Sequence, residues 1–166
     1  MKRFFITTII LGVILLGVFT VYAVQNYGAE GAQSDSNLSL EKMLTYAVQD
    51  EYLARAEYYA IMSKYGNVRP FSNIVNAEET HVNWLLPLFQ EYGYSVPVDN
   101  AKADVVLPGD MKKALEVGVQ AEIDNIAMYD KFLKEDLPAD VKVVFEELKR
   151  GSENHLRAFQ NNLRRY

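Results

Sequence analysis

Five polar side chains lie in the middle of apolar helical stripes, where an ordinary protein core would not accept them. Apolar residues that recur at steps of three and four form one face of an α-helix, and each of the five falls in such a register. The sequence therefore predicts that carboxylates and imidazoles from four helices converge on one place. The five are three glutamates and the only two histidines of the chain: Glu51, Glu78, His81, Glu122 and His155.

A metal ion is the simplest explanation for these buried acids. Burying an ion costs several kcal/mol even after relaxation, so glutamates that faced one another would repel or become protonated without a cation between them. The chain contains no cysteine, which excludes a thiolate site and leaves oxygen and nitrogen ligands. Such ligands suit iron or manganese, and zinc is also compatible.

The apolar periodicity and the capping residues predict four long helices, over about residues 39–65, 71–92, 110–133 and 140–164. Residues 94–108 lack a helical period, and an extended segment of this length reaches ~50 Å, enough to travel along a whole bundle. Short-linked hairpins joined by one long crossover have the connectivity of ferritin-like bundles. The sequence thus predicts an all-α fold, a ferritin-like four-helix bundle of two antiparallel helical hairpins joined by a long crossover.

Two tyrosines, one arginine and Ser152 are expected beside the ligands. Tyr58 and Tyr129 follow Glu51 and Glu122 by seven residues each, as a duplicated hairpin with a two-fold axis through the site would produce. We expect the two tyrosines to be hydrogen-bond donors near the site or plain core aromatics, rather than redox carriers. Arg55 lies one helical turn after Glu51, and this spacing leaves open a plain salt bridge between the two.

The other ligands also have simpler interpretations. Glu78 and His81 can form a buried hydrogen-bonded pair, Glu122 can be satisfied by Tyr58, and His155 can be a core histidine bonded to a carbonyl. Several neighbours are expected to play no part in the site. Trp84 is expected in the core and Ile126 on the inward stripe of its helix, whereas four acids off the stripes are expected in solvent: Asp50, Glu57, Glu79 and Asp124.

Two segments resemble known families. The run from Glu51-Tyr-Leu-Ala-Arg55 through Phe71-Ser-Asn-Ile74 to Glu78-x-x-His81 resembles the first half of a rubrerythrin-type ferritin-like domain. The run Arg150-Gly-Ser-Glu-Asn-His155-Leu-Arg-Ala-Phe159 resembles the family called domain of unknown function 2202. The resemblance spans residues 40–164. It implies an iron pair with Glu51 and His81 on one ion, Glu78 bridging, and Glu122 and His155 on the other.

The last helix departs from the superfamily pattern. That pattern has Glu-x-x-His, whereas this chain has Ser152 three residues before His155. Glu153 lies about 200° around the helix from His155 and cannot replace the missing carboxylate without local distortion. Three glutamates and two histidines can hold two ions with water in the gaps, or one ion well and a second loosely. The serine at position 152 therefore argues against redox activity of the ordinary di-iron type.

The favoured interpretation is an exported metal-binding protein with one or two iron or manganese ions, and with oxidase or peroxidase chemistry in which O2 or peroxide is reduced. An alternative is a non-catalytic module for metal buffering or surface binding, which Ser152 favours. A third is a structural bundle without metal, in which the buried acids are protonated or paired. No catalytic residue is assigned, and the oligomeric state is left open, with a homodimer as one option.

The first residues predict export. Met1-Lys2-Arg3 precedes an uncharged run from Phe4 to Val24, whose 21 residues fit either a cleaved signal or a membrane anchor. Either would deliver the protein outside, to the extracellular side, the cell surface or the periplasm. Without Lys2 and Arg3 the chain has 15 basic and 22 acidic side chains, a net charge of −7, which argues against a nucleic-acid partner. Polar residues 25–37 predict a flexible spacer before a single domain over residues 38–166.

Overall fold

The computed structural model describes residues 27–103 and 105–166, and within them every regular element is helical. The predicted all-α class is therefore confirmed. Among these residues, no helix combines the length and the apolar character needed to cross a membrane. The elements are α1 (Gly28–Ser34), α2 (Leu40–Tyr65), α3 (Phe71–Glu91), the short 3-10 helix η1 (Ala101–Ala103), α4 (Met111–Phe132) and α5 (Ala139–Leu163).

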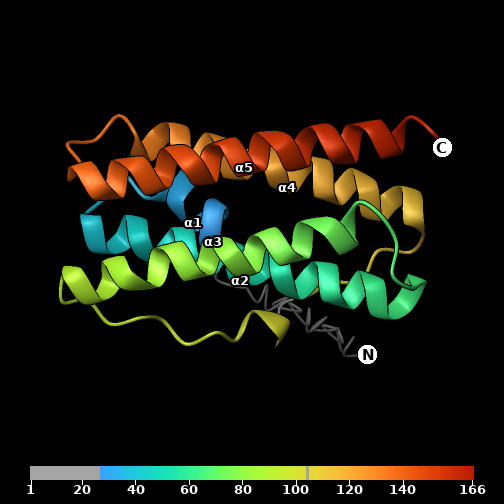
Figure 1. Cartoon of the computed structure of the whole chain (residues 1–166), viewed down its shortest axis with the longest axis horizontal. Coiled ribbons are helices and arrows are strands. Elements are labelled where there is room, and N and C mark those ends of the chain that lie inside the picture. The colour runs from blue at the N-terminus through green and yellow to red at the C-terminus, as the bar shows by residue number, and fades with distance from the viewer. Residues whose placement is uncertain (1–26, 104) are drawn as a thin grey trace, which may run out of the picture.

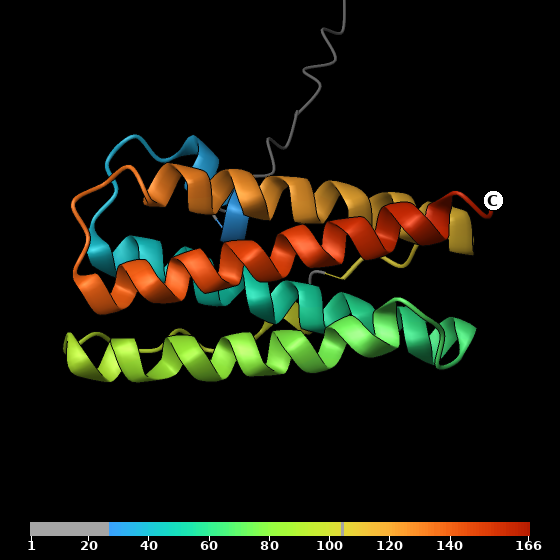
Figure 2. The same cartoon turned by 45° about the horizontal axis from the view of Figure 1, so that its top comes forward.

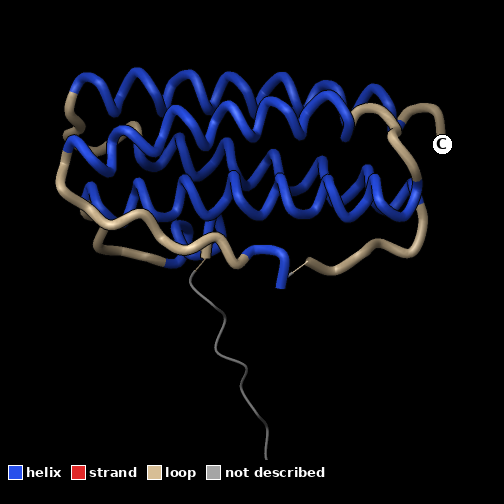
Figure 3. The backbone as a smooth tube through the Cα atoms, turned by 60° about the horizontal axis from the view of Figure 1, so that its bottom comes forward, coloured by secondary structure: helices blue, strands red, loops and turns tan. Residues whose placement is uncertain are grey.

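The four long helices form two antiparallel hairpins that lie side by side (Figure 1). α2 packs mainly against α3, and α4 packs mainly against α5. The hairpins meet where α2 contacts α4 and where α3 contacts α5. The crossover, residues 92–103 and 105–110, runs along the bundle from the end of α3 to the start of α4, and its η1 segment contacts α2 (Figure 3).

Local sequence explains where the long helices begin and end. The Ser39 side chain accepts a hydrogen bond from the backbone N–H of Lys42, and the Asp110 side chain accepts one from Lys113, so each caps a helix start. Gly66 ends α2 with a φ of 88°, a conformation that favours glycine. Each long helix begins and ends within one residue of its predicted position.

The apolar core has two parts, one towards each end of the bundle. One part contains Leu44, Leu85 and Phe145 among many others. The other contains Ile74 and Leu115 together with a cluster of three aromatic rings. Within residues 27–103 and 105–166, seven buried polar or charged side chains accompany this core: Glu51, Glu78, His81, Glu122, Asn125, Ser152 and His155.

The expectation of a flexible spacer over residues 25–37 is wrong for residues 28–34, which form α1. This short helix contacts both α2 and α4 (Figure 2). Its residues are small enough for close approach: Ala29 and Ala32 are buried, and a Cβ on Gly28 would lie 2.6 Å from Oδ1 of Asp50. Low apolar content therefore did not prevent packing, because the small side chains of α1 let its backbone lie close to the neighbouring helices.

Polar contacts fasten both ends of α1. Its first turn donates backbone hydrogen bonds to Gln49 and Asp50 on α2. At its other end, Nζ of Lys131 on α4 donates to the carbonyl oxygens of Ala32 and Asp35, at 2.7 Å each. The predicted signal or anchor over residues 1–24 lies outside the described residues.

Candidate metal centre

The structure brings all five predicted ligands together on the inward faces of four helices. Each is at most 8% exposed. Their convergence is a property of the fold, whereas metal binding by them stays a prediction. Glu51 comes from α2, Glu78 and His81 from α3, Glu122 from α4 and His155 from α5.

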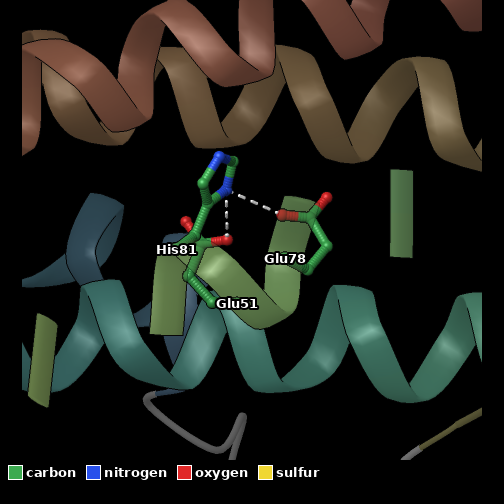
Figure 4. A group of neighbouring side chains, drawn as sticks. All are labelled: Glu51, Glu78 and His81. Carbon is green, nitrogen blue, oxygen red and sulfur yellow. Dashed lines mark hydrogen bonds and ion pairs between the residues drawn. The ribbon is translucent and has the colours of Figure 1, made fainter. Parts of the chain in front are cut away.

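The first group is Glu51, Glu78 and His81, which we call the first triad. Nδ1 of His81 lies 3.1 Å from Oε2 of Glu51 and 2.9 Å from Oε2 of Glu78 (Figure 4). Glu78 and His81 share a face because they are three residues apart on α3. Glu51 reaches them from the neighbouring helix, so the triad joins both helices of the first hairpin.

The second group is Glu78, Glu122 and His155, which we call the second triad. Nδ1 of His155 lies 3.2 Å from Oε1 of Glu78 and 3.5 Å from Oε1 of Glu122. Glu78 thus directs one oxygen towards each histidine and belongs to both triads. The two imidazole rings stack with their centroids 5.5 Å apart.

The geometry of both triads fits a metal ion. Within each triad, one ligand atom from every residue lies within 4.8 Å of the others. Ligands about 2.0–2.2 Å from a common ion lie roughly 3–4 Å from one another, so small movements suffice. Nδ1 of His155 is buried and makes no hydrogen bond, although two carboxylates lie near it. A buried nitrogen without a hydrogen-bond partner is well placed to bind a metal ion.

The charges of the site depend on one another. Burial raises the pKa of Glu51 to about 8 and the pKa of Glu122 to about 7, and the negative charge of Glu78 adds to both shifts. Burial alone would lower the pKa of His81 and of His155, but the adjacent carboxylates outweigh it and raise each to about 10. Burial also acts against an ionised Glu78, but the two imidazoles lower its pKa. Without metal, protons on the imidazoles supply the positive charge.

Two tyrosines hold the outer carboxylates from the opposite hairpin. The hydroxyl of Tyr58 on α2 donates to Oε1 of Glu122 on α4, and the hydroxyl of Tyr129 on α4 donates to Oε1 of Glu51 on α2, at 2.9 Å each. Both tyrosines are fully buried, and burial raises the pKa of each hydroxyl well above its ordinary value. The hydroxyls therefore stay protonated and act as donors.

Two expectations about neighbouring residues are wrong. Arg55 does not pair with Glu51 but forms salt bridges with Glu79 on α3 and Asp99 in the crossover, so it lies outside the site. Trp84 is 42% exposed rather than in the core, and its ring lies 5.5 Å from that of His81. The partners of Arg55 lie on segments that sequence spacing does not place relative to α2.

Sequence reasoning missed a chain of polar contacts beside the triads. The hydroxyl of Ser152 donates to Oδ1 of Asn125 at 2.7 Å, and the amide of Asn125 donates to Asp50. Asn125 is 6% exposed and faces inward where Ile126 was expected, and Ile126 is only partly buried. The position of Asn125 three residues after Glu122 was the sequence signal that could have placed it on the inward face. The hydroxyl of Ser152 is therefore bound within the core by these contacts.

A large groove lies away from the triads. It has a volume of about 1060 Å³ between α1, α2 and α4, and neither triad contributes to its lining. Asp50 and Glu57 line it and are partly buried, which corrects the expectation of solvated side chains, whereas Glu79 and Asp124 are exposed as expected. Burial raises the pKa of Asp50 to about 6 and the pKa of Glu57 to about 7.

Comparison with known proteins gives one family and one relative with a solved structure. The model of the family described as "Uncharacterized protein domain (DUF2202)" matches residues 41–165. The chain is 32% identical over 133 residues to "Uncharacterized protein MJ0754" of Methanocaldococcus jannaschii, and this alignment covers 71% of each protein. The crystal structure of hypothetical protein MJ0754 from Methanococcus jannaschii superimposes with a TM-score of 0.69 and 28% identity, over 80% of this chain and 85% of that chain.

Proposed function

The chain belongs to the DUF2202 family, and we propose that it is a ferritin-like metal-binding protein that holds one or two iron or manganese ions between its two hairpins. One observation carries the proposal: a single buried carboxylate, Glu78, is shared by two Glu/Glu/His triads whose ligand atoms each lie within 4.8 Å of one another. A cluster of this kind is expensive to bury without a cation. The hairpin and crossover connectivity also supports the ferritin-like assignment.

In this proposal Glu51, Glu78 and His81 hold one ion, and Glu78, Glu122 and His155 hold the other. Bound iron or manganese would supply one-electron chemistry towards O2 or peroxide. The protein contributes the surroundings of the site. The two parts of the core keep water out, and Tyr58 and Tyr129 fix the outer carboxylates.

Metal analysis tests this function. Protein made in medium that contains iron and manganese, and purified without chelators, is expected to carry about one to two equivalents of one of these ions. Glu78→Gln removes a ligand of both triads and should abolish binding. Glu79→Gln is the matched control, since Glu79 lies next in the sequence but is exposed. Less than about half an equivalent in the parent, unchanged in Glu78→Gln, would remove the proposal.

A second candidate is a non-catalytic module that binds metal without turnover. Ser152 favours it, because this residue stands where the superfamily has a bridging carboxylate and its hydroxyl is engaged with Asn125 and with the carbonyl of Leu148. Oxygen consumption with Fe(II), or peroxide consumption, separates the two candidates. Sustained turnover above that of Glu78→Gln would eliminate the non-catalytic one.

We also propose that the protein acts outside the cytoplasm, as one domain over residues 38–166 together with α1. The support is the basic start and the apolar run over residues 1–24. Residues 1–30 fused to a reporter enzyme that is active only after export should give activity. Lack of activity in a fusion that is stably produced would contradict export.

A further inference from the structure

Gly151 lies in the middle of α5, directly against the imidazole of His81. A Cβ placed on Gly151 would lie 2.7 Å from Cε1 and 2.8 Å from Nε2 of that ring, closer than real Cβ contacts occur. Glycine is a poor helix former, and only proline is worse in a helix interior. Its presence in the fourth turn of a 25-residue helix therefore has a steric reason, which is the histidine on the facing helix.

The ring of His81 has no room to retreat from a larger residue at position 151. Its Nδ1 edge already contacts the carboxylates of Glu51 and Glu78, at 3.1 and 2.9 Å. Trp84 and His155 also lie against the ring, each with its centroid 5.5 Å away. A Cβ on residue 151 would therefore turn the ring and break the Nδ1 contacts rather than slide the ring backwards.

The geometry points to Gly151 as a positioning residue that sets the imidazole of His81 in the first triad and acts on the second triad only weakly. The three atoms nearest to a Cβ at this position all belong to His81, and none belongs to Glu122 or His155. The two triads share Glu78 but are thus positioned by different parts of the fold. The inference about the ring stands on the contacts around His81, and its consequence for metal binding rests on the proposed function.

Nuclear magnetic resonance of the imidazoles tests the positioning directly. The chain contains two histidines, so each ring gives its own set of signals. In metal-free Gly151→Ala, the ring nitrogen signals of His81 should shift more than those of His155, as the contacts to Glu51 and Glu78 are lost. Unchanged His81 signals in a folded Gly151→Ala variant would overturn the inference.

Gly118→Ala is the matched control. Gly118 is a buried glycine within α4, and a Cβ there would meet the ring of Phe159 at 2.6 to 2.8 Å, a clash of the same size that involves no ligand. This variant should lower Tm while the His81 signals stay in place. A His81 shift as large as that of Gly151→Ala would show that any strain in the bundle moves the ring, and would overturn the assignment.

A double variant keeps the inference testable if Gly151→Ala does not fold. In a His81→Ala background the ring is gone, so adding Gly151→Ala should raise Tm, as replacement of glycine by alanine in a helix normally does. An equal loss of Tm in both backgrounds would place the clash elsewhere and contradict the inference.

Titration with Mn(II) extends the test to the site. Its binding can be followed through Trp84, the only tryptophan, whose ring lies 5.5 Å from that of His81. Gly151→Ala is expected to bind one equivalent fewer than the parent, with the remaining binding lost in Glu122→Gln. Equal binding by parent and variant would contradict the role in the first triad. If the parent itself binds no Mn(II) or Fe(II), the proposed function fails, and the ring signals still decide the positioning.

Discussion

The hydroxyl of Tyr58 on α2 donates a hydrogen bond of 2.9 Å to Oε1 of Glu122 on α4. The same contact occurs in reverse between Tyr129 and Glu51, also at 2.9 Å. Each hairpin therefore fixes the outer carboxylate of the other, and the site holds the two halves of the bundle together. Loss of either tyrosine hydroxyl should affect one triad more than the other.

Tyr58→Phe tests this arrangement. Removal of the hydroxyl leaves a buried carboxyl oxygen of Glu122 without its donor, so we expect a loss of about 1–3 kcal/mol in the free energy of unfolding. Metal affinity should fall roughly 10–100-fold, since residues that orient ligands have effects of this size. Calorimetry and Mn(II) titration measure the two effects. The control is Tyr65→Phe, whose hydroxyl donates to the carbonyl of Pro108 away from the site; equal effects of the two variants would contradict the prediction.

Metal binding should release protons. The carboxylates raise the pKa of His81 and of His155 to about 10, so at pH 7 in the metal-free protein both imidazoles are cationic, with a proton on each ring nitrogen. A ligand nitrogen must lose that proton, and affinity should therefore fall as pH falls, by up to tenfold per pH unit for each proton released. Isothermal titration with Mn(II) in buffers of different protonation enthalpy counts the protons. A binding enthalpy that does not depend on the buffer would contradict this prediction.

Stability should depend on pH through Glu57. Burial, with a contribution from Asp50, raises the pKa of Glu57 to about 7 in the folded protein, above its ordinary value of 4.5. Between about pH 4.5 and 7 the carboxyl group of Glu57 ionises in the unfolded protein but stays protonated in the folded protein. The free energy of unfolding therefore falls as the pH rises through this range, and the loss is constant above about pH 7. Glu57→Gln should therefore stabilise the fold by about 1–3 kcal/mol at pH 8 and by little at pH 4.

Urea unfolding at the two pH values measures this difference. Glu91→Gln is the control, because Glu91 is exposed on α3. A stabilisation by Glu57→Gln that is the same at both pH values would mean that the carboxyl group is not the cause.

Ser152→Glu should restore the missing carboxylate at a cost to the metal-free fold. Ser152 is 3% exposed and bound to Asn125, so a glutamate there adds a buried charge and removes that contact. We expect a loss of about 3 kcal/mol without metal, by analogy with other buried unpaired charges, and tighter binding of a second Mn(II) when metal is added. Ser152→Gln has the same size without the charge and should destabilise without the gain in binding. If the two variants bind Mn(II) alike, the fourth carboxylate does not matter here.

The ligand residues could be found in the sequence because the signal for them is local. Helical periodicity fixes which side chains share a face, and Glu51, Glu78, Glu122 and His155 stood out as charged or imidazole groups on apolar faces. The same reasoning placed the ends of the long helices, since Ser39, Asp110 and Gly66 act on the backbone next to them. Asn125 was missed by one position of the same periodicity.

Other features depended on segments that are distant in the chain. Arg55 finds its partners on α3 and in the crossover, and α1 packs through backbone and small side chains that carry no apolar pattern. The contact of Gly151 with His81 joins residues on different hairpins. The periodicity of apolar residues along a helix contains no information about contacts between residues on different segments.

The sequence by itself determined the helices, their ends and the inward acids and imidazoles, because each of these follows from the spacing of residues along one helix. Only the tertiary structure decided that Glu78 is shared by two triads, that each tyrosine reaches the opposite hairpin, and that the hydroxyl of Ser152 donates a hydrogen bond to Asn125. These relationships depend on how four helices rotate and slide against one another, and packing across the whole bundle sets that arrangement.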